Sequence, residues 1–538
     1  MMNANHTKTV LQVLDLCIKL PDGADRKLAV QDVSFTIQSG HTLCVVGESG
    51  SGKSMIANAV IGLLPKPQVV PTAGQILFEG EDLLQVTKDR LRALRGHRIA
   101  MIFQEPMTSL NPVMRIGEQL EEVLDCHRPD MPRDEKRQRV IAALRDVGLP
   151  DPEQIVNSYP FRLSGGQRQR VMIACAMVLE PTLLIADEPT TALDVTTQAQ
   201  ILVLMKDLQK RKGMALLFIT HDFGVVAQIA DQVVVMQTGQ VVEYGAAQDV
   251  LRAPQHAYTR KLIAAIPQGL ARPTSHALQS EPVLEVKNLQ KTYRSSGGWF
   301  KKPRIVHAVN NLSFMLREGE TLGLVGESGS GKSTVGRCLT GLVPKDSGEL
   351  LFKGQPLPAD VRQRSNAERG QVQMVFQDPY ASLNPRHTVG NTIAAGPIAQ
   401  GISASEAWDR TRKLLKLVGL QADAAERYPH EFSGGQRQRI AIARALAMQP
   451  QVLVADEPVS ALDVSVQAQV LELFEQVRKE FQLSMVFITH DLRVAAQMCD
   501  HIAVMRRGEL VEYGPTAEVL GNPQHAYTRE LIHAAPRF

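Results

Sequence analysis

The octapeptide GESGSGKS occurs twice in this 538-residue chain, at 47–54 and at 326–333. A glycine-rich turn of this kind, between a buried strand and a helix, lets backbone N–H groups surround phosphate oxygens. The Lys then reaches the β and γ phosphates, and the Ser reaches Mg²⁺. We expect two nucleotide sites, whose loop residues are Gly47, Glu48, Ser49, Gly50, Ser51, Gly52, Lys53 and Ser54, and Gly326, Glu327, Ser328, Gly329, Ser330, Gly331, Lys332, Ser333 and Thr334.

An apolar stretch that ends in Asp-Glu follows each loop, as LLIADEP at 183–189 and VLVADEP at 452–458. An acidic pair after a strand is most often a solvated turn, but the upstream phosphate loop favours a chemical role. We expect the Asp to hold Mg²⁺ through water and the Glu to orient or deprotonate the attacking water. The candidate metal ligands are Ser54, Gln104, Asp187, Ser333, Gln377 and Asp456, and the catalytic candidates are Glu188, His221, Glu457 and His490.

Two further polar residues follow apolar strands in each half. His221 and His490 come after LLFIT and MVFIT, where a lone His is usually structural, but its recurrence favours a contact to the γ phosphate. Gln104 and Gln377 close IAMIF and VQMVF, from which an amide can reach Mg²⁺ or the water nucleophile.

The tetrapeptide SGGQ precedes an apolar run in each half, which places it at a helix N-terminus and predicts a second anion site. One phosphate loop suffices to bind a nucleotide. We therefore expect the second anion site of each domain to contact the nucleotide that is bound by the phosphate loop of the other domain. Its residues are Ser164, Gly165, Gly166 and Gln167, and Ser433, Gly434, Gly435 and Gln436.

The later motifs repeat at a constant offset of 269 residues: Ser164, Asp187 and His221 recur as Ser433, Asp456 and His490. A constant offset indicates that the chain contains a duplicated domain. We expect domains at 1–267 and 283–538, joined by a linker at 268–282 that lacks periodicity. Alternating apolar residues at 11–16 and 33–37 predict antiparallel strands, and the segments after Gln104 and Gln377 predict helical subdomains. Both halves end in PQHAYTR, at 254–260 and 523–529.

Composition limits the class of protein. The chain is 44% apolar and 21% charged with a net charge of only +3, which gives no support for a nucleic-acid groove. Apolar runs stop short of the roughly 18 residues that a membrane span needs, and the N-terminus does not resemble a secretory signal. Six widely spaced cysteines form no CxxC pair, which argues against zinc or a disulfide framework.

The ordered motifs, from GESGSGKS through Gln104, LSGGQ, LIADEP, ALD and His221, with their second copies, closely resemble the ATP-binding cassette of ABC transporters. The resemblance implies an α/β fold with two tandem nucleotide-binding domains, each a P-loop core with an antiparallel β subdomain and a helical subdomain. It implies ATP and Mg²⁺ as ligands, and cassettes that pack head to tail. One ATP would lie between the loop at 47–54 and Ser433–Gly435, and the other between the loop at 326–333 and Ser164–Gly166.

Within that family, FQEPMTSLNP, FQDPYASLNP and PQHAYT look like the peptide and nickel importer group, and the fused form is similar to glutathione, oligopeptide or microcin importer ATPases. This resemblance implies an ATPase that energises import of small peptides at the cytoplasmic face of the bacterial inner membrane. The implied partners are two transmembrane permease subunits and, through them, a periplasmic substrate-binding protein. Nucleic acid is not an expected partner. Only Cys499 lies where some relatives bind an iron–sulfur cluster, so no cluster is expected.

One position departs from the family. In the family that the chain resembles, an aromatic residue shortly after the first strand stacks on adenine. Tyr293 fits this position in the second half, but Leu20 occupies it in the first. We expect weaker adenine packing at the Leu20 site.

Two other classes of function stay open. A soluble tandem-cassette ATPase acting on ribosomes or nucleic acid would tend to carry a long charged linker or CxxC insertions, and this chain has neither. A regulatory nucleotide sensor would be expected to lack a catalytic Glu or His in one half, and both halves keep them.

Overall fold

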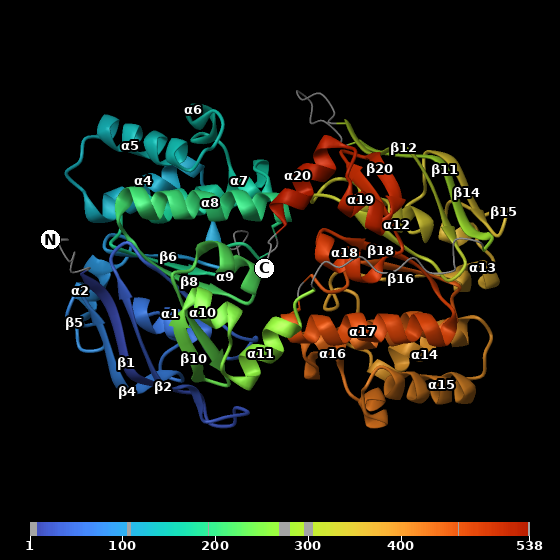
Figure 1. Ribbon diagram of the computed structural model, residues 1–538, viewed down its shortest axis with the longest axis horizontal. Helices are drawn as coiled ribbons and strands as arrows, with labels where there is room; N and C mark the ends of the chain where they lie inside the picture. Colours follow the sequence, from blue (N-terminus) through green and yellow to red (C-terminus); the bar gives the residue numbers. More distant parts are fainter. Residues whose placement is uncertain are drawn as a thin grey trace. The chain divides into compact units, whose positions relative to one another are not determined.

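The computed structural model describes residues 8–104, 109–191, 193–267, 280–294, 305–460 and 462–535. Contacts within the chain separate two compact units, the first built around residues 1–193 and 197–266 and the second around residues 267–535. Each unit contains one four-stranded and one six-stranded sheet, in the same topology. The expected α/β class with two tandem cassette-like domains is confirmed (Figure 1).

The first unit opens with an antiparallel sheet of order β2-β1-β4-β5. The long strand β1 (Thr9–Lys19) pairs with β2 (Leu28–Gln38) on one side and β4 (Val70–Phe78) on the other, and β5 is the short strand Glu81–Asp82. This arrangement confirms the antiparallel strands expected at 11–16 and 33–37. Most apolar side chains of β1 and β2 are buried in the core of the unit, whereas Leu14 and Leu28 are half-buried.

The six-stranded sheet of the first unit has the order β10-β9-β3-β8-β7-β6. Five strands are parallel, and β10 pairs antiparallel with β9. The three central strands are buried along their whole length, as continuous apolar runs are in parallel sheets covered on both faces. The bounds are β3 (Thr42–Val46), β6 (Ile99–Ile102), β7 (Leu183–Asp187), β8 (Ala215–Thr220), β9 (Gln232–Gln237) and β10 (Gln240–Ala246).

Helices follow the strands of this sheet and form a separate region between β6 and β7. That region, expected to be helical, holds α4 (Ile116–His127), α5 (Arg133–Asp146) and α6 (Pro152–Ile155), which lie at the opposite end of the unit from β1 and β4 (Figure 1). The remaining helices are α1 (Lys53–Ile61), α2 (Lys88–Leu94), α7 (Gly165–Met177), α8 (Val195–Lys212), α9 (Phe223–Ile229), α10 (Ala247–Arg252) and α11 (Ala257–Ala264).

The second unit repeats this plan with sheets of order β12-β11-β14-β15 and β16-β17-β18-β13-β19-β20. Its strands are β11 (Pro282–Arg294), β12 (Ile305–Arg317), β13 (Thr321–Val325), β14 (Ser347–Phe352), β15 (Gln355–Pro356), β16 (Val372–Val375), β17 (Val452–Asp456), β18 (Ser484–Thr489), β19 (His501–Arg506) and β20 (Glu509–Pro515). Its helices are α12 (Lys332–Leu339), α13 (Asn366–Gln371), α14 (Val389–Ala399), α15 (Ala404–Leu417), α16 (Gly434–Ala447), α17 (Val464–Phe481), α18 (Leu492–Met498), α19 (Thr516–Gly521) and α20 (Ala526–Ala534).

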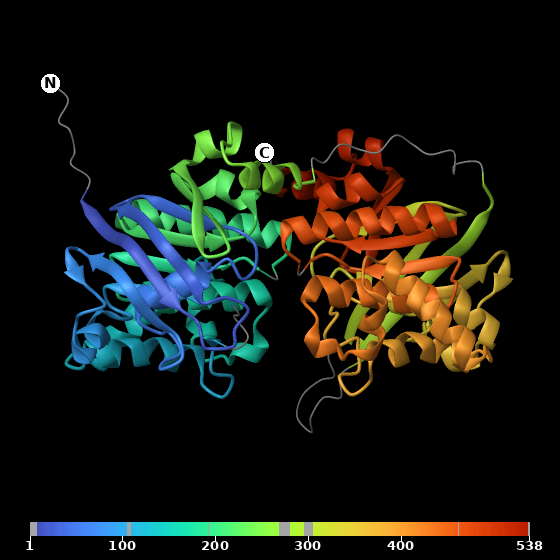
Figure 2. The same ribbon diagram turned by 90° about the horizontal axis from the view of Figure 1, so that it is seen from below.

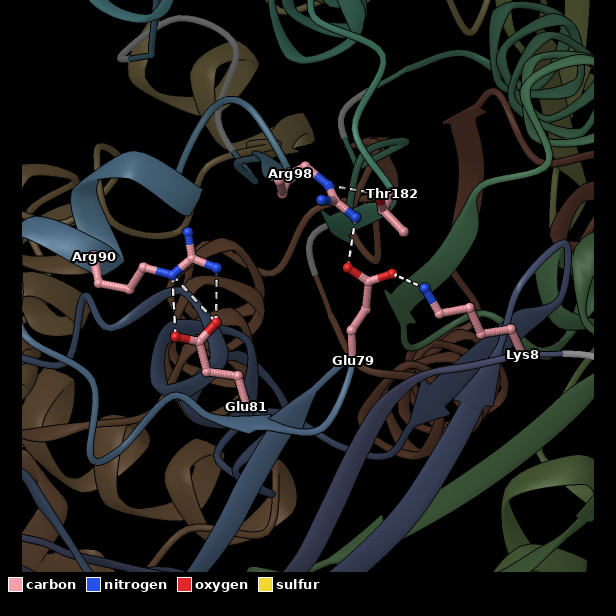
Figure 3. A network of polar contacts seen from close by, with 6 residues as sticks. All are labelled: Lys8, Glu79, Glu81, Arg90, Arg98 and Thr182. Atoms are coloured by element: carbon pink, nitrogen blue, oxygen red, sulfur yellow. Dashed lines mark hydrogen bonds and ion pairs between the residues drawn. The ribbon is translucent and has the colours of Figure 1, made fainter.

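A polar network joins the two sheets of the first unit near the starts of β6 and β7, and Figure 3 shows its residues. Glu79, directly after β4, pairs with Lys8 and with Arg98, which precedes β6. The Arg98 guanidinium also donates to Thr182 Oγ1 over 2.9 Å, and the backbone N–H of Thr182 donates to Arg98 O. Chiefly through the hydrogen bond from Lys8, these cations hold the pKa of Glu79 below its ordinary value.

Several expectations concern residues outside the described part. They include residues 268–279 of the expected linker, residues 105–108 after Gln104, and Ala192 and Ala461 of the two ALD motifs. Residues 295–304 also lie outside the described part. The strand β11 begins at Pro282, the last residue of the expected linker. Within the described residues, no helix has the length and apolar composition needed to span a membrane.

Candidate functional site

In the first unit, the predicted phosphate-loop, metal and catalytic residues lie at or just beyond the carboxyl ends of parallel strands. The phosphate loop follows β3, Asp187 ends β7, His221 follows β8, and Gln104 lies two residues beyond β6. Since β8 lies between β3 and β7, the three loops share one edge of the sheet. This edge is where open parallel sheets bind ligands.

Lysine and glycine set the shape of the first phosphate loop. Lys53 is buried, and its Nζ donates to Gly47 O over 2.8 Å and to Glu48 O over 2.9 Å. Gly52 begins α1 in a left-handed conformation, with φ of 102°. A Cβ at Gly47 would lie 2.3 Å from Met236 O of β9, so this position accepts only glycine.

The residues predicted to hold Mg²⁺ are in contact. Ser54 Oγ donates to Asp187 Oδ1 over 3.0 Å, which brings two hard oxygen ligands together at the end of the phosphate loop. Burial raises the pKa of Asp187, and a bound cation would favour its ionised form. The pair therefore fits a Mg²⁺ ion held with the phosphates of a nucleotide.

Glu188 is the centre of a second polar cluster. Its carboxylate accepts from Gln104 Nε2 over 3.2 Å and from Thr191 Oγ1 over 3.0 Å, and His221 Nδ1 lies 3.2 Å from the same oxygen, Oε2. Burial alone would raise the pKa of Glu188, but the hydrogen bond and charge of His221, together with Lys53, outweigh burial and lower it. An ionised carboxylate held by three side chains can orient a water molecule or accept its proton.

The second unit reproduces the phosphate loop and the metal pair. Lys332 Nζ donates to Gly326 O over 2.7 Å and to Glu327 O over 2.8 Å, and Ser333 Oγ donates to Asp456 Oδ1 over 2.9 Å. Burial raises the pKa of Asp456 as it does that of Asp187.

The second unit also reproduces the glutamate cluster. Gln377 Nε2 donates to Glu457 Oε2 over 2.8 Å, and His490 Nδ1 lies 3.4 Å from Glu457 Oε1. Burial opposes ionisation of both groups, but their mutual hydrogen bond and charge lower the pKa of Glu457 and raise that of His490. Ser460 Oγ donates to the backbone O of Glu457, whereas Thr191 bonds the Glu188 carboxylate.

A cavity opens over each phosphate loop. The first measures about 620 Å³ and is lined by the loop, Gln104, Glu188, Leu20, Arg26 and Tyr258, among others. The second measures about 430 Å³ and is lined by the loop, Gln377, Glu457, His307 and Arg507, among others. Both have the size of small-ligand sites.

The predicted aromatic position differs between the units. Leu20 follows β1, is partly buried against the core and lines the first cavity. Tyr293 lies in β11 and is 41% exposed, with Lys291 Nζ 5.8 Å from the centre of its ring, but it is not among the residues that line the second cavity.

Each SGGQ tetrapeptide begins a helix, as expected. Ser164 is the N-cap of α7, where its hydroxyl accepts from the Gln167 N–H, and Ser433 caps α16 in the same way with Gln436. A Cβ at Gly166 would lie 2.7 Å from the Thr197 side chain of α8, and one at Gly435 would lie 2.3 Å from Val466 of α17. Gly166 and Gly435 therefore allow two helices to pack closely. The lack of a side chain also leaves the N-terminus of the helix accessible to a ligand.

The sequence interpretation missed two kinds of residue at the site. Arg26 donates to Gly50 O of the first loop, and no repeated motif marks it. Tyr258 contacts Glu48 of the first loop, and Tyr527 contacts Glu327 of the second. The recurrence of PQHAYTR in both halves was the signal available for the tyrosines.

Comparison with known families gives two matches. A family model described as "ABC transporter" matches residues 30–191 and 309–460. A model described as "Oligopeptide/dipeptide transporter, C-terminal region" matches residues 242–292 and 511–538.

Relatives match over nearly the whole chain. The peptidoglycan transport ATP-binding protein YejF of Agrobacterium fabrum is 47% identical over 538 residues, covering 99% of this chain and 98% of that protein. The glutathione import ATP-binding protein GsiA of Escherichia coli is 46% identical over 558 residues, covering 98% of this chain and 89% of that protein. A solved dimeric bacterial ABC transporter cassette is 28% identical and covers 44% of this chain and 98% of its own, with a TM-score of 0.40.

Proposed function

The chain belongs to the ABC transporter family, and from that premise we propose that it is the ATP-hydrolysing subunit of a membrane importer for small peptides. The names of its relatives and the match to a peptide-transporter C-terminal region support a di- or oligopeptide or glutathione-like substrate. The soluble alternative, acting on ribosomes or nucleic acid, is not favoured by these relatives.

The observation that carries the proposal is the completeness of both sites. Each unit places a Lys on its phosphate loop, a Ser–Asp pair and a Glu held by Gln and His. A regulatory sensor would not need both glutamates. We assign Lys53 and Lys332 to the β and γ phosphates, and Glu188 and Glu457 to the attacking water.

The proposed chemistry is in-line transfer of the γ-phosphoryl group to water. Bound Mg²⁺, held by Ser54 and Asp187 or by Ser333 and Asp456, would neutralise phosphate charge. Gln104 and Gln377 would orient the glutamates and contact the metal or the water, while His221 and His490 would contact the γ phosphate. The pKa of each glutamate is lowered by its histidine and lysine neighbours, which favours the ionised carboxylate.

We also propose that the SGGQ of each cassette completes the nucleotide site of the other cassette. Exposed Ser164 and Ser433 at the starts of α7 and α16 support an anion-binding role, because a helix N-terminus offers unpaired N–H groups. Ser433→Arg should then impair hydrolysis at the site of Lys53, and Ser164→Arg should impair it at the site of Lys332.

The proposed partners are two permease subunits, which would hold this chain at the cytoplasmic face of the inner membrane and link it to a periplasmic binding protein. A groove of about 330 Å³ in the second unit supports a docking place beside Gln377. It is lined by apolar side chains that include Leu342, Phe376 and Ile393, together with Arg444. An apolar side of a permease helix fits such a groove.

Reconstitution tests this function. The purified full-length chain should have low ATPase activity alone, and a reconstituted permease pair with peptide-loaded binding protein should raise it. The chain should sediment with membranes from cells that contain the permease genes and stay in the supernatant when these genes are deleted. Equal sedimentation with and without them, or co-purification with ribosomes, would contradict the importer assignment.

A groove variant sharpens this test. Leu342 is 48% exposed at the groove, so Leu342→Asp should reduce sedimentation with permease-containing membranes without unfolding the chain. Val203→Asp, on the exposed side of α8, is the matched control and should sediment like the wild type.

A further inference from the structure

The PQHAYTR segments that end both units have no part in the chemistry described so far, yet each lies against the phosphate loop of its own unit. In the first unit the segment leads into α11, which with α10 lies beside β10 in both views (Figure 1 and Figure 2). In the second unit it leads into α20.

A glutamate of the preceding strand shapes each segment. Glu243 of β10 accepts from the backbone N–H of Gln255 over 2.7 Å and from that of His256 over 3.1 Å. His256 Nδ1 then accepts from the Tyr258 N–H over 3.2 Å and caps α11. In this way β10 of the six-stranded sheet positions the start of α11, the helix that carries Tyr258.

The second unit repeats this construction. Glu512 of β20 accepts from the N–H of Gln524 over 2.7 Å and of His525 over 3.1 Å, and His525 Nδ1 accepts from the Tyr527 N–H over 3.1 Å. Tyr527 is fully buried, and burial raises the pKa of its phenol to about 12, so the hydroxyl stays neutral. The Arg506 guanidinium lies 4.6 Å from the centre of the Tyr527 ring.

Each tyrosine hydroxyl meets the second residue of the phosphate loop. The backbone N–H of Glu48 donates to the Tyr258 hydroxyl over 3.3 Å, and this hydroxyl donates to Glu48 Oε2 over 3.1 Å. In the second unit the N–H of Glu327 donates to the Tyr527 hydroxyl over 3.2 Å.

The lysine and the tyrosine therefore hold opposite ends of one peptide group. Gly47 O and the Glu48 N–H belong to the same planar unit, and Lys53 Nζ binds the oxygen while Tyr258 binds the N–H. Lys332 and Tyr527 hold the peptide of Gly326 and Glu327 in the same way. If the lysine instead binds the phosphates of a nucleotide, the tyrosine still holds the N–H of this peptide.

We propose that Tyr258 and Tyr527 are positioning residues that keep the phosphate loops in the conformation that accepts ATP, so that the C-terminal segments set nucleotide affinity. This inference rests on the proposed nucleotide-binding role of the two loops. A loop held in its binding conformation loses less freedom when the ligand arrives, so the tyrosines act on affinity. They do not touch the reacting atoms, and the rate at saturating ATP should not depend on them.

The test removes only the hydroxyl groups. In the full-length chain, Tyr258→Phe with Tyr527→Phe should weaken equilibrium binding of Mg-ATP by roughly 3- to 10-fold, as the loss of the hydrogen bond from the loop N–H to the hydroxyl predicts at each site. At the first site Tyr258→Phe also removes the hydrogen bond to Glu48 Oε2. The KM for ATP should rise by a similar factor with kcat unchanged. Tyr244→Phe with Tyr513→Phe is the matched control, because these hydroxyls contact Gln232 and Met315 O, away from the loops.

Binding is measured well below the melting temperature of every variant, so that reduced stability cannot imitate reduced affinity. Affinity equal to that of the control pair, or a fall in kcat with unchanged affinity, would overturn the positioning role. Lys53→Ala with Lys332→Ala, measured in parallel, tests the loops themselves. If the lysine variant loses ATP and the tyrosine variant does not, only the positioning role fails; if the lysine variant binds normally, the nucleotide-site assignment fails.

Discussion

Gln377 Nε2 donates to Glu457 Oε2 over 2.8 Å and joins the segment after β16 to the carboxylate after β17. Gln104 and Glu188 form the same hydrogen bond over 3.2 Å in the first unit. Each glutamine precedes the stretch of chain that leads into the helical region, so this hydrogen bond joins the start of that stretch to the glutamate.

Removing the glutamine amides should slow hydrolysis without abolishing it. Gln104→Ala with Gln377→Ala leaves the carboxylates, and the loss of a hydrogen bond to a charged group predicts a fall in kcat of roughly tenfold. Steady-state phosphate release is the measurement. Gln373→Ala is the control, because Gln373 lies in the preceding strand β16 and donates to Arg369 O. An equal loss of kcat in this control would contradict the role of the Gln–Glu hydrogen bond.

Unequal adenine stacking is the second prediction. Tyr293→Ala should weaken ATP at its site more than Leu20→Ala does at the other, because an aromatic ring adds about 0.5–1.5 kcal/mol beyond its buried area. The affinity ratio should be several-fold in a site-resolved binding assay. Tyr293 is not among the residues that line the second cavity. Equal losses of affinity would therefore mean that another side chain packs on the base.

The third prediction concerns pH and the start of α11. Burial would raise the pKa of Glu243, but hydrogen bonds that include the N–H groups of Gln255 and His256 outweigh it and lower the pKa. A lowered pKa in the folded state stabilises the fold above the ordinary range of a carboxyl group, and this contribution is lost as pH falls through the folded value.

The melting temperature of Glu243→Gln should therefore be lower than that of the wild type at pH 7. The difference in melting temperature should shrink as the pH approaches about 4. Thermal melts across this range give the measurement. Glu153→Gln removes only an exposed ion pair with Arg145 and should show a small difference at every pH. A difference in melting temperature between Glu243→Gln and the wild type that stays constant with pH would contradict the proposed charge effect.

Much of the fold and of the candidate site follows from the sequence. Lys53, Ser54 and Asp187 could be placed together because the motifs follow buried parallel strands, whose carboxyl ends share one edge. The antiparallel strands followed from period-two alternation, and Ser164 as a helix cap followed from SGGQ before an apolar run.

The contacts of the PQHAYTR segment could not be predicted in this way. Tyr258 lies 210 residues from Glu48, and their hydrogen bond depends on how α11 packs beside the central sheet. No local periodicity encodes such packing, although the repetition of the segment marked it as worth explaining. The contact of Arg26 with Gly50 O could not be predicted from the sequence either, because Arg26 lies in a loop that belongs to no repeated motif.

Hydrolysis by Glu188→Gln with Glu457→Gln tests the central claim of two complete ATPase sites most directly. The phosphate loops, the Ser–Asp pairs and the SGGQ helix starts all remain, so the variant should bind Mg-ATP as the wild type does and retain it unhydrolysed. Loss of a positioned general base should lower turnover by roughly 10²- to 10⁴-fold, with Glu153→Gln as the unaffected surface control. Turnover near the wild-type rate, measured together with the nucleotide retained, would remove both glutamates from the reaction and contradict the account.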